Sequence, residues 1–267
     1  MKKLHFILLL CCCTLTSFAQ RGWELGGTVG VAYYFGDLNT TFDLGSPGLM
    51  AGLAARYNFN NRLCLKMSAN YLTISADDAN SSNSFERARN LNFQSNIIDG
   101  TFQFEFNFLP YNHGSRDEFF TPYLFSGFSV YHFDPKTELN GETYQLRTFG
   151  TEGQFRGEEY YSIGGALTFG GGIKFDLSYR WSINIELSSR KLFTDFIDDV
   201  SGTYPDMDDL EALRGPIAVA LSDRSMTADG VRIGGEGRQR GNGRSNDNFS
   251  TLGVSLLYYF GSLPCPW

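Results

Sequence analysis

The segment TFQFEFNF, Thr101 to Phe108, alternates phenylalanine with polar side chains without a break. Successive side chains of a β-strand point to opposite faces, so a strand here has one aromatic face and one polar face. The polar face includes the charged side chain of Glu105. The segment therefore predicts a strand that separates an apolar surrounding from a polar interior.

The same alternation recurs along most of the chain. Seven further segments show it, at residues 23–36, 49–59, 63–71, 121–133, 167–175, 181–190 and 248–260. Their lengths suit the roughly 9–11 residues that a tilted strand needs to cross a bilayer. With the first segment they predict eight strands.

The connections between these segments alternate in length. The short ones are residues 58–62, 110–119 and 178–180, and the long ones are 37–48, 76–90, 134–161 and 193–247. Short periplasmic turns and long external loops are typical of outer-membrane barrels. The pattern predicts an all-β protein, an eight-stranded antiparallel transmembrane outer-membrane β-barrel with both termini in the periplasm. A soluble barrel or sandwich is the alternative, because alternation alone shows only that one face is apolar.

The N-terminus has the pattern of a signal peptide. Two lysines precede an apolar run, and Ser17 and Ala19 place small residues at positions −3 and −1 of a cleavage site after Ala19. Cys11 has no small residue before it, so a lipoprotein signal does not fit. We expect a signal peptide over residues 1–19 and a single barrel domain over 20–267.

Charge and cysteine content narrow the class of protein. The chain has 22 basic and 29 acidic residues, and loss of two lysines with the signal peptide changes the net charge from −7 to −9. An acidic chain argues against nucleic acid as a partner. Outside the signal peptide the cysteines are Cys64 and Cys265, for which a disulfide and two separate thiols both stay open.

Charged residues of both signs fall opposite the apolar faces of the strands. An eight-stranded barrel encloses a space just wide enough for side chains, so these charges are expected to pair across a narrow lumen beside small glycines. The expected lumen charge network comprises Glu24, Arg56, Lys66, Glu105, Lys174, Glu186 and Arg190.

Three aromatic residues, Tyr33, Tyr34 and Phe35, stand side by side where the first strand ends at Gly36. Aromatic rings are favoured at the interface between hydrocarbon and headgroups. We expect all three at the level where the strand leaves the hydrocarbon.

The sequence shows no constellation typical of an enzyme or a cofactor site. The glycine-rich run GGALTFGGGIKF lies inside a strand pattern and lacks the ending of a phosphate loop. His113 in a turn and His132 near the top of a strand suggest no Ser-His-carboxylate set. We therefore expect no enzymatic activity, no cofactor and no metal.

Two stretches of the last long loop, residues 193–247, have unusual composition. The first is rich in aspartate from Asp195 to Asp209, so calcium is conceivable, but the ligand spacing of an EF-hand is absent. Asp206 to Leu221 instead predicts one short helix with acids in its first turn. The second, residues 230–248, is rich in glycine and arginine and is expected to be a mobile external loop that can touch acidic glycolipid.

Several motifs occur in a specific order over about residues 23–260: ELGGTVGVAYYFGDLN, RNLNFQSNIIDGTFQFEFNF, TPYLFSGFSVYHFDPKTELNGETYQL and FGGGIKFDLSYRWSINIELSSRKLFTDFIDDVSGTY. In this order they resemble the PorG family. The resemblance implies a small outer-membrane barrel of the type IX secretion system of Bacteroidetes-type bacteria. It also implies association with a periplasmic ring, built by a PorK-like lipoprotein and a PorN-like subunit, and no catalytic residues.

We expect the protein to be a non-enzymatic component of the outer membrane that anchors or organises this ring. Its other expected partner is the lipid of the outer membrane. The contacts should come from the periplasmic turns and from the tail 261–267, which is either a docking element or a plug under the barrel. The alternative is a surface-exposed binding or adhesion barrel that acts through its long external loops. The candidate contact residues are Asn60, Asn61, Arg62, Asn112, Arg116, Tyr179, Arg180, Pro264 and Trp267.

Overall fold

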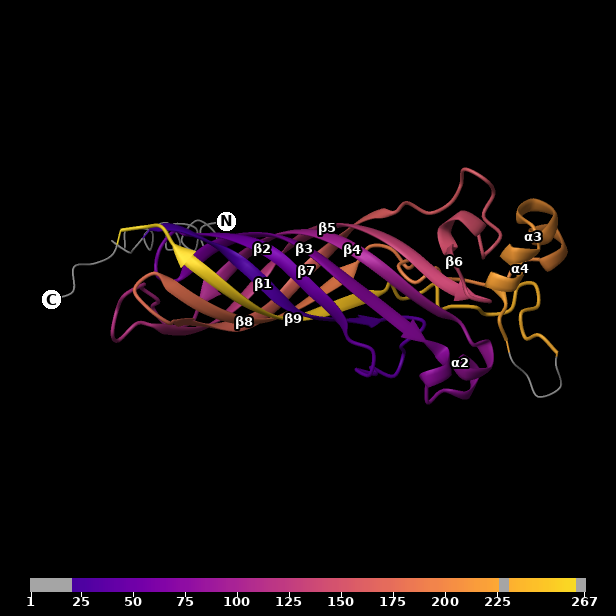
Figure 1. The fold of residues 1–267 in the computed structure, drawn as a ribbon, viewed down its shortest axis with the longest axis horizontal. Coiled ribbons are helices and arrows are strands. Elements are labelled where there is room, and N and C mark those ends of the chain that lie inside the picture. The colour runs from indigo at the N-terminus through magenta and orange to yellow at the C-terminus, as the bar shows by residue number, and fades with distance from the viewer. Residues whose placement is uncertain (1–20, 226–230, 263–267) are drawn as a thin grey trace, which may run out of the picture.

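A computed structural model describes residues 21–225 and 231–262 of the chain. Within them eight strands form an antiparallel sheet that closes on itself, because β1 pairs with β9 and β4 pairs with β5 (Figure 1). This confirms the eight-stranded barrel. The barrel strands are β1 (Gly22–Phe35), β2 (Gly48–Asn58), β3 (Leu63–Asp77), β4 (Asn92–Asn107), β5 (Phe120–Leu139), β7 (Ile163–Asp176), β8 (Trp181–Leu192) and β9 (Asn248–Tyr259).

The two faces of the barrel wall follow the alternation of the sequence. On β4, Phe102 is 52% exposed on the outside, whereas Glu105 is fully buried in the interior. Leu53, Leu124 and Leu187 are likewise exposed on the outer face of other strands. The barrel is therefore apolar outside and holds buried charged side chains inside, the reverse of a water-soluble protein.

The two ends of the barrel differ. The turn end carries the short connections 59–62, 108–119 and 177–180, and there β1 begins and β9 ends. The loop end carries the connections 36–47, 78–91, 140–162 and 193–247, with all the labelled helices at this end in Figure 1. The alternation of short and long connections is thus confirmed.

The loop end contains several short elements. No helix of the described residues has the length and apolar composition needed to cross a membrane. The elements are η2 (Asp78–Asn80), α2 (Ser84–Arg89), β6 (Glu142–Gln145), η3 (Leu146–Phe149), α3 (Met207–Arg214) and α4 (Pro216–Ser222).

The prediction that residues 134–161 form one loop is wrong at its start. β5 continues to Leu139 and forms a hairpin with β6, in which Leu139 pairs with Glu142. Asn140 and Gly141 between them both have positive φ, 55° and 84°. An Asn-Gly pair accepts these angles readily, so it makes the tight turn that a two-residue hairpin requires.

The single helix predicted over 206–221 is also wrong, because the chain forms two. Asp206 caps α3 by accepting hydrogen bonds from the backbone N–H groups of Asp208 and Asp209. Gly215, at φ 90°, ends α3, and Pro216 starts α4 at its first position, where its missing N–H is not needed.

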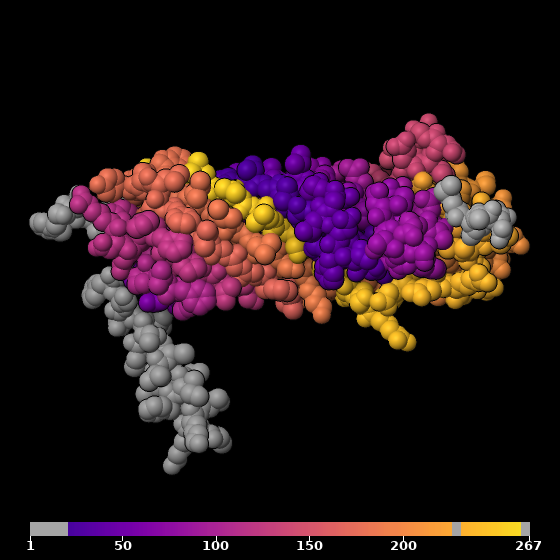
Figure 2. Space-filling view, turned by 90° about the horizontal axis from the view of Figure 1, so that it is seen from below, coloured from indigo at the N-terminus to yellow at the C-terminus, as the bar shows by residue number. Residues whose placement is uncertain are grey.

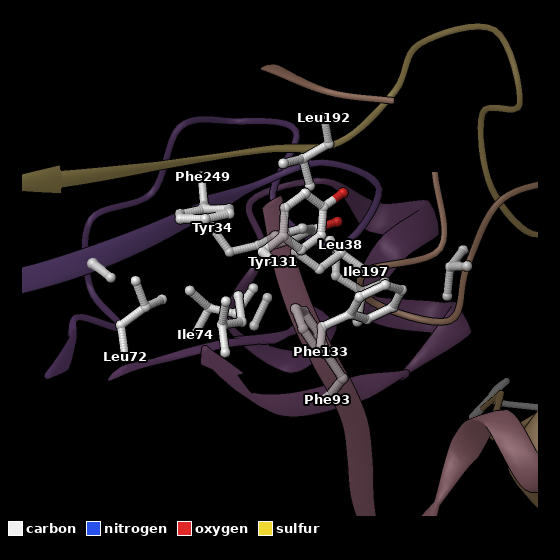
Figure 3. Close-up of a cluster of buried hydrophobic side chains, with 14 of the residues drawn as sticks. Tyr34, Leu38, Leu72, Ile74, Phe93, Tyr131, Phe133, Leu192, Ile197 and Phe249 are labelled. Carbon is white, nitrogen blue, oxygen red and sulfur yellow. The ribbon is translucent and has the colours of Figure 1, made fainter. Parts of the chain in front are cut away.

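An apolar cluster fills the loop-end half of the interior (Figure 3). Tyr34, Phe133 and Phe249 reach it from barrel strands, whereas Leu38 and Ile197 reach it from the loops. The loops therefore fold into the barrel mouth. This corrects the expectation for Tyr34: β-strand alternation turns its ring into this cluster, so it does not lie at the headgroups with its neighbours.

Candidate functional site

The centre of the lumen is a chain of buried ion pairs from four strands. Arg56 Nη1 lies 3.0 Å from Glu24 Oε2, and Arg56 Nε lies 2.9 Å from Glu105 Oε2. Lys174 Nζ lies 2.7 Å from the same Glu105 oxygen and sits over the ring of Tyr123, 4.4 Å from its centroid. These side chains have no solvent contact, so each charge depends on its partners for stabilisation.

Two further pairs reach across the barrel. Lys66 Nζ on β3 lies 2.7 Å from Glu186 Oε2 on β8, and Arg190 Nη2 on β8 lies 2.7 Å from Asp99 Oδ2 on β4. Asp99 completes a set of four carboxylates and four cations, and the sequence analysis missed it. The signal was available, because Asp99 continues the inward parity of Thr101 and Glu105.

The lumen is filled rather than open. The structure places all seven expected charges inside, and small residues make room for larger ones. A Cβ added to Gly172 would lie 3.0 Å from the Tyr123 ring, and one added to Gly170 would lie 2.6 Å from the Phe125 ring. A cavity beside Lys66 and Glu186 has a volume of about 20 Å³, room for about one water molecule. This cavity is too small for a solute much larger than water.

The turn 108–119 folds back and closes the turn end. His113, expected in a turn, is only 2% exposed because it enters the barrel mouth. Its Nε2 lies 3.2 Å from Glu24 Oε1, its Nδ1 lies 2.9 Å from Asp176 Oδ1, and its ring stacks on Tyr259 at 4.3 Å. The hydroxyl of Tyr111 also contacts Asp176. A plug thus exists at this end, made by Tyr111 and His113.

This geometry predicts a pH-dependent stability. Burial lowers the pKa of His113, but the contacts with Asp176 and Glu24 outweigh burial and raise the pKa from 6.5 to about 9. Since the raised pKa belongs to the folded state, the stabilisation is fully present below pH 6.5 and is lost as pH rises through 9. We expect a loss of at most about 3 kcal/mol in the free energy of unfolding, measured by urea unfolding in detergent between pH 6 and pH 10.

The variant His113→Gln should remove most of this pH dependence. The exposed His132 on the outer wall provides the matched control, since His132→Gln should leave the profile unchanged. A wild-type profile that is flat between pH 6.5 and 9 would contradict the assignment.

Arg89 connects three loops at the loop end. Its Nε and Nη2 contact both carboxylate oxygens of Asp78 at 2.7 and 2.8 Å. Its Nη1 donates to the carbonyl oxygen of Arg240 at 2.5 Å, and its Nη2 donates to that of Asp37 at 2.8 Å. One buried guanidinium thus joins the loops 36–47, 78–91 and 193–247.

Arg240 corrects the expectation of a mobile glycine/arginine-rich loop. It is 1% exposed, and its Nη1 contacts Glu152 Oε1 at 3.0 Å and the carbonyl oxygen of Asp199 at 2.5 Å. The segment around it is held because a buried guanidinium needs these acceptors. Within the described part of 230–248, the buried residues Arg240, Gly241 and Asp247 are therefore packed into the loop end, whereas Arg232, Arg238 and Arg244 stay exposed.

Carboxylates converge on Tyr34 beneath this layer. The Tyr34 hydroxyl lies 2.5 Å from Asp198 Oδ2 and 2.9 Å from Asp247 Oδ1. Burial, and then repulsion from neighbouring carboxylates, raises the pKa of Asp198 and Asp247 well above its usual range. The Tyr34 hydroxyl thus lies between the two carboxyl groups. Among the described residues no cluster of His, Cys, Asp and Glu is arranged to hold a metal ion.

Several expected contact residues at the turn end have partners within the chain. Asn60 Oδ1 accepts from the N–H groups of Arg62 and Leu63 at 2.8 Å, which forms the turn. Arg180 Nη1 donates to the carbonyl oxygens of Tyr259 and Gly261 at 3.1 and 3.3 Å.

The remaining expected contact residues divide into three groups. The carbonyl of Asn61 accepts from the side chain of Asn107, and the side chain of Asn112 contacts Glu118. Arg62, Arg116 and Tyr179 are exposed, and Arg62 Nη1 also donates to the carbonyl oxygen of Phe108 at 2.7 Å. Pro264 and Trp267 lie outside the described residues, as does Cys265. Cys64 has a free thiol in the lumen, 3.7 Å from Lys174 Nζ.

Comparison with known proteins places this barrel in a family. Residues 2–218 match the family model described as "Domain of unknown function (DUF6089)". The chain belongs to this family. Curated proteins give no match to this DUF6089 chain.

Solved structures similar to the DUF6089 barrel include several bacterial proteins. The outer membrane protein OprG from Pseudomonas aeruginosa is 11% identical, with 91% of this chain and 98% of that chain covered and a TM-score of 0.45. Neisserial surface protein A is 10% identical, with 90% and 97% covered and a TM-score of 0.44. The attachment invasion locus protein Ail of Yersinia pestis is 11% identical, with 91% and 99% covered and a TM-score of 0.40.

Proposed function

We propose that this DUF6089 protein spans the outer membrane and anchors a periplasmic protein assembly without enzymatic activity. The observation that carries the proposal is a barrel with an apolar outer wall, a lumen filled by paired charges, and plugs of side chains at both ends. Such a barrel resists unfolding and passes no solute. A rigid attachment point is the function that this arrangement serves best.

The outer wall supports the membrane location, as does the signal peptide expected over residues 1–19. Exposed Leu53, Phe102 and Leu187 belong to an apolar surface that covers the barrel, and contact of this surface with water would be unfavourable in free energy. Lipid removes that penalty. With the signal peptide expected over 1–19, the outer membrane is the natural destination. The long loops then face outside and the turn end faces the periplasm.

The nature of the assembly is proposed from the ordered motifs that resemble the PorG family. They point to the ring of the type IX secretion system, with its PorK-like lipoprotein and PorN-like subunit. The exposed Arg62, Arg116 and Tyr179 at the turn end can make such contacts. Tyrosine and arginine are the residue types that most often dominate the binding energy of interfaces.

A second candidate function is binding of a surface ligand at the loop end. An ordered polar groove of about 480 Å³ there favours it, with Asp77, Asn92, Lys136 and Glu138 among its lining residues. The loops around this groove are held in one arrangement by the hydrogen bonds of Arg89 and Arg240.

A pull-down from outer membranes separates the two candidates. We expect a tagged wild-type chain, purified in mild detergent after crosslinking, to bring the ring lipoprotein and its partner subunit at a constant ratio. The double variant Arg116→Glu/Tyr179→Ala should lower their recovery at least about tenfold, because hot-spot residues contribute about 2 kcal/mol or more. Mass spectrometry of the eluate gives the measurement.

The loop end offers a matched control, the double variant Arg156→Glu/Tyr161→Ala, since both side chains are exposed there. This variant should recover the ring subunits normally. Loss of a surface ligand from the loop-end variant, with no change in the turn-end variant, would instead favour the surface-binding function. A wild-type barrel that elutes alone after crosslinking would reject the anchoring function.

A further inference from the structure

A groove interrupts the outer wall of the barrel near the loop end. It has a volume of about 710 Å³ and lies where β9 runs beside β1 and β8, a strip visible in Figure 2 as the yellow band. Its lining includes Phe35, Phe42, Phe169, Ser189, Lys191 and Arg244.

The strand register explains why a groove forms here. Phe169 on β7 pairs with Ser189 on β8, and Ser189 pairs with Ser250 on β9. The two serines form a low floor, joined by a hydrogen bond of 3.1 Å between their hydroxyls, beside the taller Phe169. Towards the turn end the same outward rows continue with the exposed Leu187 and Leu252. The groove therefore lies where the wall changes from apolar to polar.

One wall of the groove is an aromatic side chain held outwards by its loop. Phe42 is 72% exposed and has φ 56°, a conformation that costs a bulky residue about 1–2 kcal/mol. Reciprocal hydrogen bonds of 2.8 Å between Asn39 and Asp43 hold the loop in this shape, and Phe42 contacts the ring of Phe35. The loop thus holds Phe42 in an unfavourable backbone conformation that places its ring beside the barrel wall.

The rim of the groove is positively charged. Lys191 follows the outward row of β8, Arg244 comes from the last long loop, and both are exposed. The described lining residues include these two cations and no acid, although the whole chain has a net charge of −7. The positive rim is thus complementary to an anionic group attached to an apolar molecule that lies along the barrel wall.

We propose that this groove binds a phosphate-bearing glycolipid of the leaflet around the loop end. An acyl chain lies along Phe35, Phe42 and Phe169, while the phosphate lies between Lys191 and Arg244. The hydroxyls of the serine floor face the polar linkage between the two. This site rests on the proposed membrane-spanning function and gives the barrel a lipid that fixes its depth in the bilayer.

Native mass spectrometry of the refolded mature chain, titrated with bisphosphorylated lipid A, tests the site. The double variant Lys191→Gln/Arg244→Gln should bind about ten- to thirty-fold more weakly, since each cation near an anionic headgroup contributes about 1 kcal/mol. Arg232→Gln/Arg238→Gln is the matched control, because it removes two exposed cations of the same loop outside the groove. The control should bind lipid A with the affinity of wild type. Removing the phosphates from lipid A should weaken its binding to wild type as much as the double variant weakens the binding of intact lipid A.

Two results would overturn the lipid site while the anchoring function stands: groove and control variants that bind equally, or equal affinity for lipid A with and without phosphates. If millimolar inorganic phosphate alone displaces lipid A, the groove is a simple anion site and not a lipid site. The same samples are checked for insertion into vesicles by protection from protease. Failure to insert would reject the membrane function, and the lipid site with it.

Discussion

Replacing Arg56 by methionine will lower the free energy of unfolding of the barrel by about 3–5 kcal/mol. Arg56 lies between Glu24 and Glu105, and all three side chains are fully buried. Methionine fills much of the same volume but leaves two carboxylates with less compensation in a medium that solvates them poorly. Urea unfolding of the detergent-refolded chain, followed by tryptophan fluorescence, measures the change.

The matched control for Arg56 is Arg116→Met at the turn end, where the side chain is exposed. It should change the free energy of unfolding by less than about 0.5 kcal/mol. The double variant Arg56→Met/Glu24→Gln should lose less unfolding free energy than the two single variants together. The reason is that Glu24→Gln removes a carboxylate charge that Arg56→Met would leave without its partner. A loss below about 1 kcal/mol for Arg56→Met would show that water reaches this part of the lumen.

Replacing Arg89 by methionine will open the loop end while the barrel stays folded. The substitution removes the two contacts with Asp78 and the hydrogen bonds to the carbonyls of Asp37 and Arg240. Loss of a buried charged partner costs about 3–5 kcal/mol, here in the local stability of three loops. Hydrogen exchange in residues 36–47, 78–91 and 231–247 should therefore become faster by two to three orders of magnitude, about 1.4 kcal/mol for each order.

Arg87→Met on the same short helix is the control, because the Arg87 side chain is exposed and its hydrogen bond within the described residues goes to the carbonyl of Ser81 in its own loop. It should leave exchange in 36–47 and 231–247 unchanged. Equal exchange in wild type and Arg89→Met would contradict the joining role of Arg89. Simultaneous loss of protection in the strands would mean that loop end and barrel unfold as one unit.

The repeating pattern of the chain determined the barrel wall. Alternation with period two assigns each side chain to one face as soon as the strand is recognised, so Phe102 and Glu105 could be placed from their spacing alone. The same parity placed all seven expected charges in the lumen, and it also holds for Asp99, which lies in the same strand segment, residues 98–108. The Asn140-Gly141 turn was also readable, since an Asn-Gly pair between extended segments is a local hairpin signal.

The tertiary structure alone decided how the barrel is closed and which charges meet. Tyr34 contacts Asp198 and Asp247, which are 164 and 213 residues away in the chain. His113 could be seen as a histidine in a turn, but its place beneath Glu24 and Asp176 depends on how that turn folds back. Loops have no period that assigns a side chain to a face. Their contacts are selected by burial and by the need of each buried charge for a partner, and these conditions exist only once distant segments have been brought together.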